Sequence, residues 1–344
     1  MTRKSRLVLW TCGACLVPLL LSACTGGAST DQPATVPPSN SSPVVEVTAG
    51  SETTEGWSVV ATVSVGATPV GVAVTPDGSR AYVANYDGGT VSVIDTASNT
   101  VVGTVAVVGD PGPVAISPNG ELAYVPGGGG GTVSVIDTES NTVSGTIALG
   151  GAFAIAVSPD GRYAYVSDDD ETVNVIDTLS RAVAGTIAVG KMPHGVAMTP
   201  DGRYVYVANY GDNTVSVIDT GSNMVVRTIA TEKGPFDVAV TPDGRHVYVS
   251  HADEWTMGII DVTTNTVTRT VSLDRTQGRL AVSPNGTQLF VADYQVVKVI
   301  DTATDAIVDS IEVGNRPIAV AFAPDGRSAY VANTGDGTVT VLAR

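Results

Sequence analysis

The residues of this 344-residue chain that could bind a metal ion are few, because the sequence contains only three histidines. Two of them, His194 and His251, lie in neighbouring segments of similar sequence, and Asp212, Asp253 and Glu254 are near them. Two imidazoles and a carboxylate form a known ligand set for divalent metals. The sequence therefore requires no cofactor, but these five residues make a bound divalent cation possible.

Other catalytic signatures are missing from the sequence. A Gly-x-Ser-x-Gly nucleophile elbow does not occur, and the glycine run 127–131 lacks the Lys-Ser/Thr of a phosphate-binding loop. Cys12 and Cys15 have the Cys-x-x-Cys spacing of redox sites, but they lie in an apolar N-terminal run. These absences favour a protein that is not an enzyme.

The elements that must position these residues come from an internal repeat. The triplet Pro-(Asp/Asn)-Gly recurs seven times at intervals of 40 to 42 residues. Its copies begin at Pro76, Pro118, Pro159, Pro200, Pro242, Pro284 and Pro324. A repeat of this length is typical of propellers and other repeat architectures.

Each repeat predicts four short strands, because β-branched and apolar runs alternate with turns rich in Gly, Pro, Asn and Asp. The seventh copy ends after its third strand, and residues 57–63 match the missing fourth strand. We therefore predict an all-β fold in which residues 57–344 form a seven-bladed β-propeller of four-stranded antiparallel blades. The N-terminal strand would close the last blade.

This strand order predicts a candidate pocket at the mouth of the central channel. The connections that lead into each first strand should meet there and bring together His194, Phe153, Phe236, Asp237 and Arg279. An apolar concavity with a few polar groups is typical of a binding site. The alternative is a filled channel with one satisfied histidine and one ion pair. The acidic loops on the same face have the oxygen ligands that calcium prefers, but a solvated acidic rim is the favoured interpretation.

The N-terminus predicts export. Residues 1–23 have a basic start, an apolar run and small residues before Cys24, as in a lipoprotein signal peptide. We expect Cys24 to be lipidated and residues 24–56, rich in Ser, Thr, Pro and Gly, to form a flexible tether. The predicted location is the extracytoplasmic side of a bacterial cell membrane, with membrane attachment through the lipid anchor only.

The charge of the chain limits its partners. The formal net charge is −16, and loss of Arg3, Lys4 and Arg6 with the signal peptide would leave −19. Such a charge opposes binding to nucleic acid. We expect a monomer whose partner is a protein or a glycan at the cell surface.

The repeated Tyr-Val-Ala-Asn, Pro-Asp-Gly and Thr-Val-Ser-Val-Ile-Asp-Thr motifs resemble the YVTN-type β-propeller repeat over residues 57–344. That family includes archaeal surface-layer proteins and exported bacterial proteins. Relatives by fold include lactonases, quinoprotein and haem oxidoreductases, and nitrous oxide reductase, whose histidine-rich copper centres three histidines cannot build. The resemblance implies the fold far more strongly than an activity.

Three functions follow from these observations. The first is a non-catalytic binding or interaction module at the cell surface. The second is a lactonase-like hydrolase or lyase with a metal at the channel mouth. The third, which rests on the fold alone, is a quinone-cofactor redox protein.

The lipid attachment can be tested directly. We expect Cys24→Ala to move the protein from the membrane fraction to the soluble fraction, because the variant lacks the thiol that carries the lipid. Cys15→Ala, within the signal peptide, should leave the distribution unchanged. Cell fractionation with immunoblotting measures both, and a Cys24→Ala protein that stays with the membrane would refute the attachment.

Overall fold

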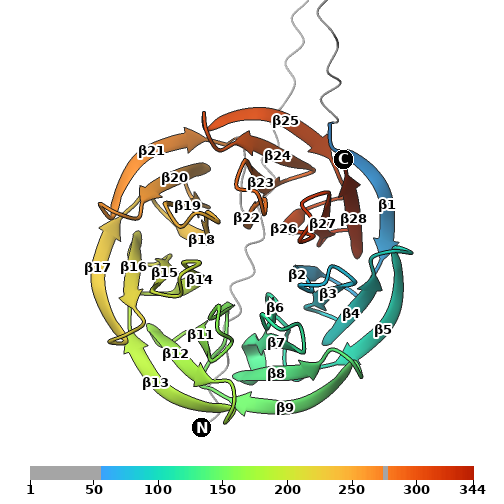
Figure 1. The fold of residues 1–344 in the computed structure, drawn as a ribbon, viewed down its shortest axis with the longest axis horizontal. Helices are drawn as coiled ribbons and strands as arrows, with labels where there is room; N and C mark the ends of the chain where they lie inside the picture. Colours follow the sequence, from blue (N-terminus) through green and yellow to red (C-terminus); the bar gives the residue numbers. More distant parts are fainter. Residues whose placement is uncertain (1–55, 274–277) are drawn as a thin grey trace, which may run out of the picture. The chain divides into compact units, whose positions relative to one another are not determined.

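The computed structural model describes residues 56–273 and 278–344, so the predicted signal peptide, Cys24 and the tether up to residue 55 lie outside the described residues. The described chain forms seven four-stranded antiparallel sheets arranged as the blades of a ring (Figure 1). The predicted seven-bladed β-propeller is therefore confirmed. Within these two described segments, no helix has the length and apolar character needed to cross a membrane.

Every blade contributes one strand to each of four concentric layers (Figure 1). The innermost strands are β2 (Pro69–Val74), β6 (Ala115–Ile116), β10 (Ile155–Val157), β14 (Pro193–Met198), β18 (Pro235–Val240), β22 (Leu280–Val282) and β26 (Pro317–Phe322). The second strands are β3 (Arg80–Asn85), β7 (Leu122–Gly127), β11 (Tyr163–Ser167), β15 (Tyr204–Asn209), β19 (His246–His251), β23 (Gln288–Asp293) and β27 (Ser328–Asn333).

The third strands are β4 (Thr90–Asp95), β8 (Thr132–Asp137), β12 (Thr172–Asp177), β16 (Thr214–Asp219), β20 (Thr256–Asp261), β24 (Val296–Asp301) and β28 (Thr338–Ala343). The outermost strands are β5 (Thr100–Ala106), β9 (Thr142–Ala148), β13 (Ala182–Ala188), β17 (Met224–Ala230), β21 (Thr266–Ser272), β25 (Ala306–Glu312) and β1 (Ser58–Ser64). A 3-10 turn, η1 (Gly128–Gly130), follows β7. Blades are numbered 1 to 7 from β2, and β1 belongs to blade 7.

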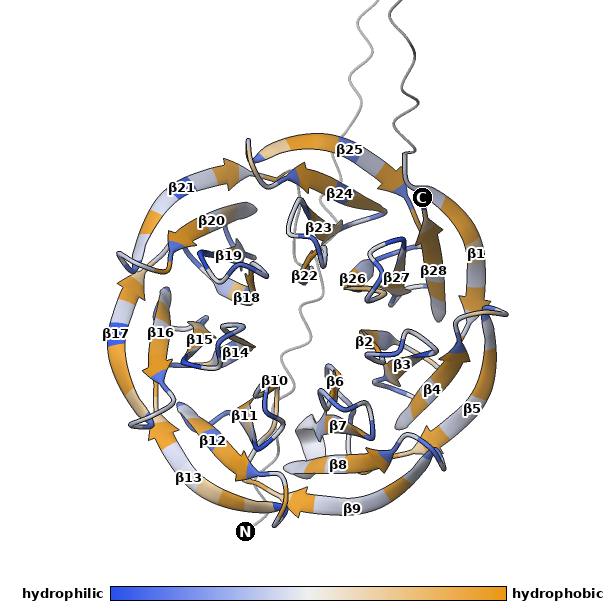
Figure 2. Cartoon of the chain, viewed as in Figure 1, coloured by the Kyte–Doolittle hydropathy of each residue, from blue (hydrophilic) through white to orange (hydrophobic). Residues whose placement is uncertain are grey.

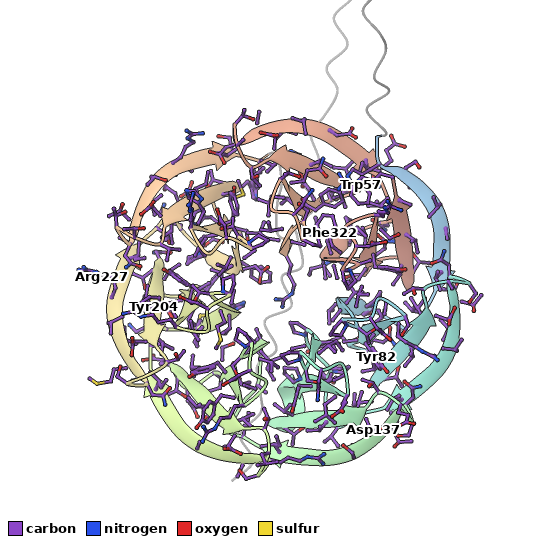
Figure 3. The ribbon with its side chains drawn as sticks, viewed as in Figure 1. Trp57, Tyr82, Asp137, Tyr204, Arg227 and Phe322 are labelled. Atoms are coloured by element: carbon purple, nitrogen blue, oxygen red, sulfur yellow. The ribbon has the colours of Figure 1, made fainter. Side chains whose placement is uncertain are left out.

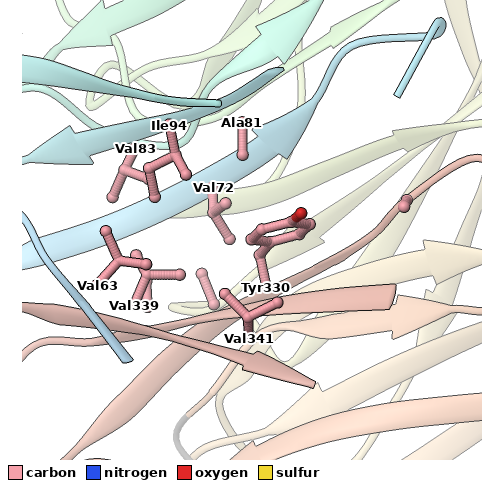
Figure 4. Close-up of a cluster of buried hydrophobic side chains, with 11 residues drawn as sticks. Val63, Val72, Ala81, Val83, Ile94, Tyr330, Val339 and Val341 are labelled. Atoms are coloured by element: carbon pink, nitrogen blue, oxygen red, sulfur yellow. The ribbon is translucent and has the colours of Figure 1, made fainter. Parts of the chain in front are cut away.

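The core lies between the blades. The second and third strands are almost entirely buried and mostly apolar, whereas the outermost strands are mostly exposed and mix apolar with polar residues (Figure 2). Buried side chains of adjacent blades form seven clusters, one at each junction. At the junction of blades 7 and 1, Tyr330 and Val341 pack against Val72 and Val83 (Figure 4).

The repeated turns lock neighbouring blades together on one face, which we call the turn face. The glycine of each Pro-Asp-Gly turn has a φ of 67° to 78°, which glycine adopts without strain. A Cβ at Gly120 would lie 3.4 Å from Cδ of Pro76 in the preceding blade. The same contact recurs around the ring, so these residues repeat because of packing.

The aspartates that end the third strands are also structural. Asp95 accepts a backbone hydrogen bond of 2.9 Å from Ser98, which holds the pKa of its carboxyl below the usual value. The same arrangement holds at Asp137, Asp177, Asp219, Asp261 and Asp301. These exposed carboxylates stabilise turns, and the structure gives them no other role.

Blade 7 is closed by the N-terminal strand. β1 pairs antiparallel with β28, with Ser58 opposite Ala343. Trp57 lies between blades 6 and 7, where its indole N–H donates to Gln288 Oε1 over 2.9 Å. Its ring contacts Phe290 and Phe322 edge-on, at centroid distances of 5.0 and 5.7 Å (Figure 3). The predicted closing strand is therefore confirmed.

The other face, which we call the mouth face, carries the connections into the innermost strands and the loops between second and third strands. These two sets of segments are hydrogen-bonded to each other. The Tyr86 N–H, for example, donates to the Thr68 carbonyl over 2.9 Å, and Tyr210 and Met192 do the same in blade 4. Loops on this face differ from blade to blade.

Because Trp57 helps to close the ring, its replacement should strongly lower the stability of the propeller. We expect Trp57→Ala to lower the free energy of unfolding by about 3–5 kcal/mol, because a large side chain leaves a cavity between two blades. Val60→Ala on the same strand should cost less than about 0.5 kcal/mol, because Val60 is 54% exposed. Chemical denaturation measures both, and equal midpoints for the two variants would contradict this account of closure.

Candidate functional site

The first candidate site is a group of four aromatic side chains and one arginine on the mouth face. We call it the mouth cluster, and it consists of Phe153, His194, Tyr210, Phe236 and Arg279. The His194 ring stacks on Phe153 and on Tyr210, at centroid distances of 5.0 and 5.3 Å and interplanar angles of 25° and 28°. Phe236 lies 5.2 Å from the same ring, tilted by 54°. The structure thus brings the predicted pocket residues of blades 3, 4 and 5 together.

The positions of these residues explain why they meet. His194 is on β14 and Phe236 is on β18, both innermost strands, and Phe153 lies two residues before β10. The corresponding positions in the other blades are small or aliphatic: Val70, Gly112, Gly278 and Ile318. The aromatic side chains therefore occupy one arc of the ring of innermost strands.

The imidazole of His194 is neutral at neutral pH. Burial lowers its pKa to about 4, and the nearby Arg279 guanidinium lowers it further in the same direction. None of the residues in 56–273 or 278–344 hydrogen-bonds to its ring nitrogens, whereas its carbonyl accepts a bond of 2.7 Å from Ser167. A positioned, neutral imidazole can donate through one nitrogen and accept through the other.

Arg279 of the mouth cluster forms an ion pair with Asp237, as the sequence suggested. Arg279 Nη1 lies 3.2 Å from Asp237 Oδ1, and the Leu280 N–H donates to the other carboxylate oxygen over 2.9 Å. Burial raises the pKa of Asp237, and Arg279 opposes that shift. The guanidinium also lies 5.8 Å from the Phe236 ring centroid. The pair adds a charged edge to the mouth cluster with little net charge.

The five predicted metal ligands are not brought together. Asp212 accepts from the Lys191 N–H over 2.9 Å, Glu254 pairs with Lys233 at 3.2 Å, and Asp253 accepts from the Tyr210 hydroxyl over 2.8 Å. Within residues 56–273 and 278–344, no three His, Cys, Asp or Glu side chains are grouped to hold a metal ion. The prediction that these loops converge on a cation is therefore wrong.

His251 has a different role from the predicted one. It is fully buried at the end of β19, where Nδ1 lies 3.0 Å from the Thr256 hydroxyl. Burial lowers the pKa of His251 to about 4. Gly258 faces the ring, and a Cβ there would lie 2.9 Å from His251 Cε1. The histidine is thus packed within its own blade.

His251 and Gly258 belong to a set of pairs that the sequence analysis missed. Each pair combines the last residue of the second strand, or the residue after it, with the third residue of the third strand. The pairs are Asn85–Ser92, Gly127–Ser134, Asp168–Asn174, Asn209–Ser216, His251–Gly258, Asp293–Lys298 and Asn333–Thr340. Five are hydrogen-bonded or ion-paired, for example Asn85 to Ser92 at 3.0 Å and Lys298 to Asp293 at 3.1 Å. Aligning the third strands would have shown that the two positions change together.

The exposed aromatic side chains of the described residues lie on the mouth face, whereas most other exposed large apolar side chains lie on the outermost strands. Phe153, Trp255 and Tyr294 are 39%, 47% and 57% exposed, and all three lie in connections or loops of this face. Met192 and Val108, in two of the connections, are exposed as well. On the turn face the most exposed apolar residue is Leu179, which stands alone in one turn. An exposed set of aromatic side chains is typical of a binding surface.

Comparison with known proteins gives matches to propellers. Two family models match parts of the chain: the cytochrome D1 heme domain over residues 117–239 and the YNCE-like beta-propeller over residues 199–297. Among solved structures, hydrazine synthase of Kuenenia stuttgartiensis superposes with a TM-score of 0.76 at 26% identity, covering 80% of this chain and 96% of that chain. No curated protein matches the chain at a significant level. The predicted resemblance to repeat-built propellers is confirmed.

The pairing of His251 with Gly258 can be tested by exchange with another blade. We expect Gly258→Ser to lower the free energy of unfolding by about 1–3 kcal/mol, because the added atoms overlap the imidazole. The double variant H251N/G258S recreates the Asn85–Ser92 pair and should recover most of that loss. Chemical denaturation of the wild type, both single variants and the double variant measures the coupling. Additive effects would show that the two positions do not depend on each other.

Proposed function

We propose that this protein is a binding module, tethered by a lipid at Cys24 to the extracytoplasmic side of the cell membrane, whose mouth face binds a protein or a glycan. The observation that carries the proposal is that the exposed aromatic side chains of the described residues, Phe153, Trp255 and Tyr294, all lie on this face. They are held by a closed ring, so little conformational entropy is lost when they bind.

The two faces of the ring differ in the way expected of a scaffold and its binding surface. On the turn face, nearly every aspartate, glycine and proline is used in a turn or a blade contact. On the mouth face, Phe153, Trp255 and Tyr294 present exposed aromatic side chains to the solvent. Aromatic residues are enriched among the side chains that dominate binding energy.

The tether suits this role. Residues 25–56 as a flexible chain would have a root-mean-square length of roughly 30 Å. Such a length would let a monomeric propeller turn its mouth face toward partners in the cell envelope. The net charge of −16 opposes nucleic acid as a partner.

A second candidate function, tetrapyrrole binding at the mouth cluster, is favoured by one observation. The match to the cytochrome D1 heme domain spans residues 117–239, which include Phe153, His194 and Phe236. Neutral imidazole is the form that ligates iron, and His194 has free ring nitrogens among the described residues. A tetrapyrrole would supply light absorption and redox chemistry, and the aromatic side chains would pack against it. The lactonase-like alternative is less favoured, because the five predicted metal ligands do not form a group of three among residues 56–273 and 278–344.

Cross-linking in living cells tests the binding face. We expect a photo-cross-linking amino acid at position 255 or 294 to give a defined adduct on intact cells, because both side chains project from the mouth face. The same group at position 179, which is 93% exposed on the turn face, is the matched control and should give none. Gel shifts and mass spectrometry identify the adducts. Equal labelling from both faces, or labelling from position 179 alone, would contradict the proposal.

A further inference from the structure

A polar pocket lies between blades 5 and 6, away from the mouth cluster. Its volume is about 210 Å³, room for roughly seven water molecules at their volume in the liquid. Blade 5 contributes side chains from β19 and β21, and blade 6 contributes the turn between β24 and β25. The polar residues that line it are His246, Tyr248, Thr268, Arg269, Thr302 and Asp305.

The pocket coincides with a departure from the repeat. At three other junctions a tyrosine of one blade donates its hydroxyl hydrogen to an asparagine of the next, as Tyr206 does to Asn265 over 3.1 Å. The other two pairs are Tyr82–Asn141 and Tyr165–Asn223. At the junction of blades 5 and 6 an aspartate, Asp305, takes the place of the asparagine, with the same left-handed backbone at φ 57°.

An arginine on the outer strand of blade 5 holds this aspartate. Arg269 Nη1 binds Asp305 Oδ2 and also donates to the Thr304 carbonyl over 3.3 Å. The carboxylate is thereby held by the outer strand of blade 5, and the Tyr248 hydroxyl also hydrogen-bonds to it. The space beside the Tyr248 ring, which an asparagine shares at the other junctions, is part of the pocket.

The groups in the pocket select the chemistry of a ligand. Asp305 and the imidazole of His246 can accept hydrogen bonds, whereas Arg269 and the Tyr248 hydroxyl can donate. An anion would be repelled by the Asp305 carboxylate, which lines the pocket. A cation would be repelled by the positive charge of the Arg269 guanidinium. A neutral molecule with adjacent hydroxyls can donate to the carboxylate and accept from the guanidinium at once.

We propose that this pocket binds a single sugar ring, either a free hexose or one residue of a glycan. The vicinal hydroxyls would bridge Asp305 and Arg269, and the ring would occupy the space beside Tyr248 and His246. This site is separate from the mouth face and does not depend on what the mouth face binds.

Ligand-detected NMR on the whole chain carrying Cys24→Ala tests the site without lipid. Saturation transfer is measured to glucose, galactose, mannose and N-acetylglucosamine, with acetate and choline as charged probes. We expect at least one sugar to bind with a dissociation constant of the order of 1 mM and neither ion to bind. An oligomer of that sugar, tested in the same way, distinguishes a glycan residue from a free hexose.

Two variants locate the binding. Asp305→Asn restores the residue of the other junctions, so it should fold at least as well while lowering the sugar affinity tenfold or more. Arg269→Ala should do the same, whereas Arg227→Ala, at the matching position of β17 in blade 4 (Figure 3), should change nothing. Binding of no sugar, binding of acetate or choline instead, or a sugar signal unchanged in Asp305→Asn would overturn the proposal.

Discussion

The structure depends on contacts between blades, because no blade can bury its own apolar faces. Each of the seven core clusters is shared by two neighbouring sheets, so each blade is stable only while both of its neighbours are in place. A ring satisfies this requirement without leaving a terminal blade, provided that the chain returns to its starting point. The pairing of β1 with β28 performs that step.

The junction of blades 6 and 7 shows how strongly this constraint acts on individual residues. In blade 7 the two outer strands, β28 and β1, are not joined by a turn, so no turn asparagine lies at this junction. Blade 6 has Phe290 where other blades have the hydroxyl-bearing tyrosine. Trp57 fills the space and its N–H bonds to Gln288. The departure from the repeat is therefore explained by packing alone.

Other departures have no such explanation, and they are the candidates for function. Phe153, His194 and Phe236 enlarge one arc of the innermost layer, although four blades close the ring with small or aliphatic residues there. Asp305 replaces an asparagine that would have closed its junction. In both cases the scaffold keeps its backbone and changes the chemistry that it presents.

Much of the fold could be predicted from the sequence, because turn glycines, prolines and β-branched runs repeat with a constant interval. The mouth cluster could be predicted in part, since alignment of the repeats places His194 beside Phe153 and Phe236. The sequence wrongly predicted a metal site, because residues that share a face of the ring need not point toward one another. His251 turns into its own blade against Gly258, and Tyr210, which stacks on His194, had no marker in the sequence.

The most direct test of the account is native mass spectrometry with elemental analysis of the mature chain purified from its own host. A binding module with the neutral, aromatic mouth cluster described above predicts the mass of the lipidated polypeptide, with no metal or cofactor in stoichiometric amount. A metal or tetrapyrrole present at one per chain, and lost in His194→Ala, would contradict the account and make the mouth cluster a cofactor site.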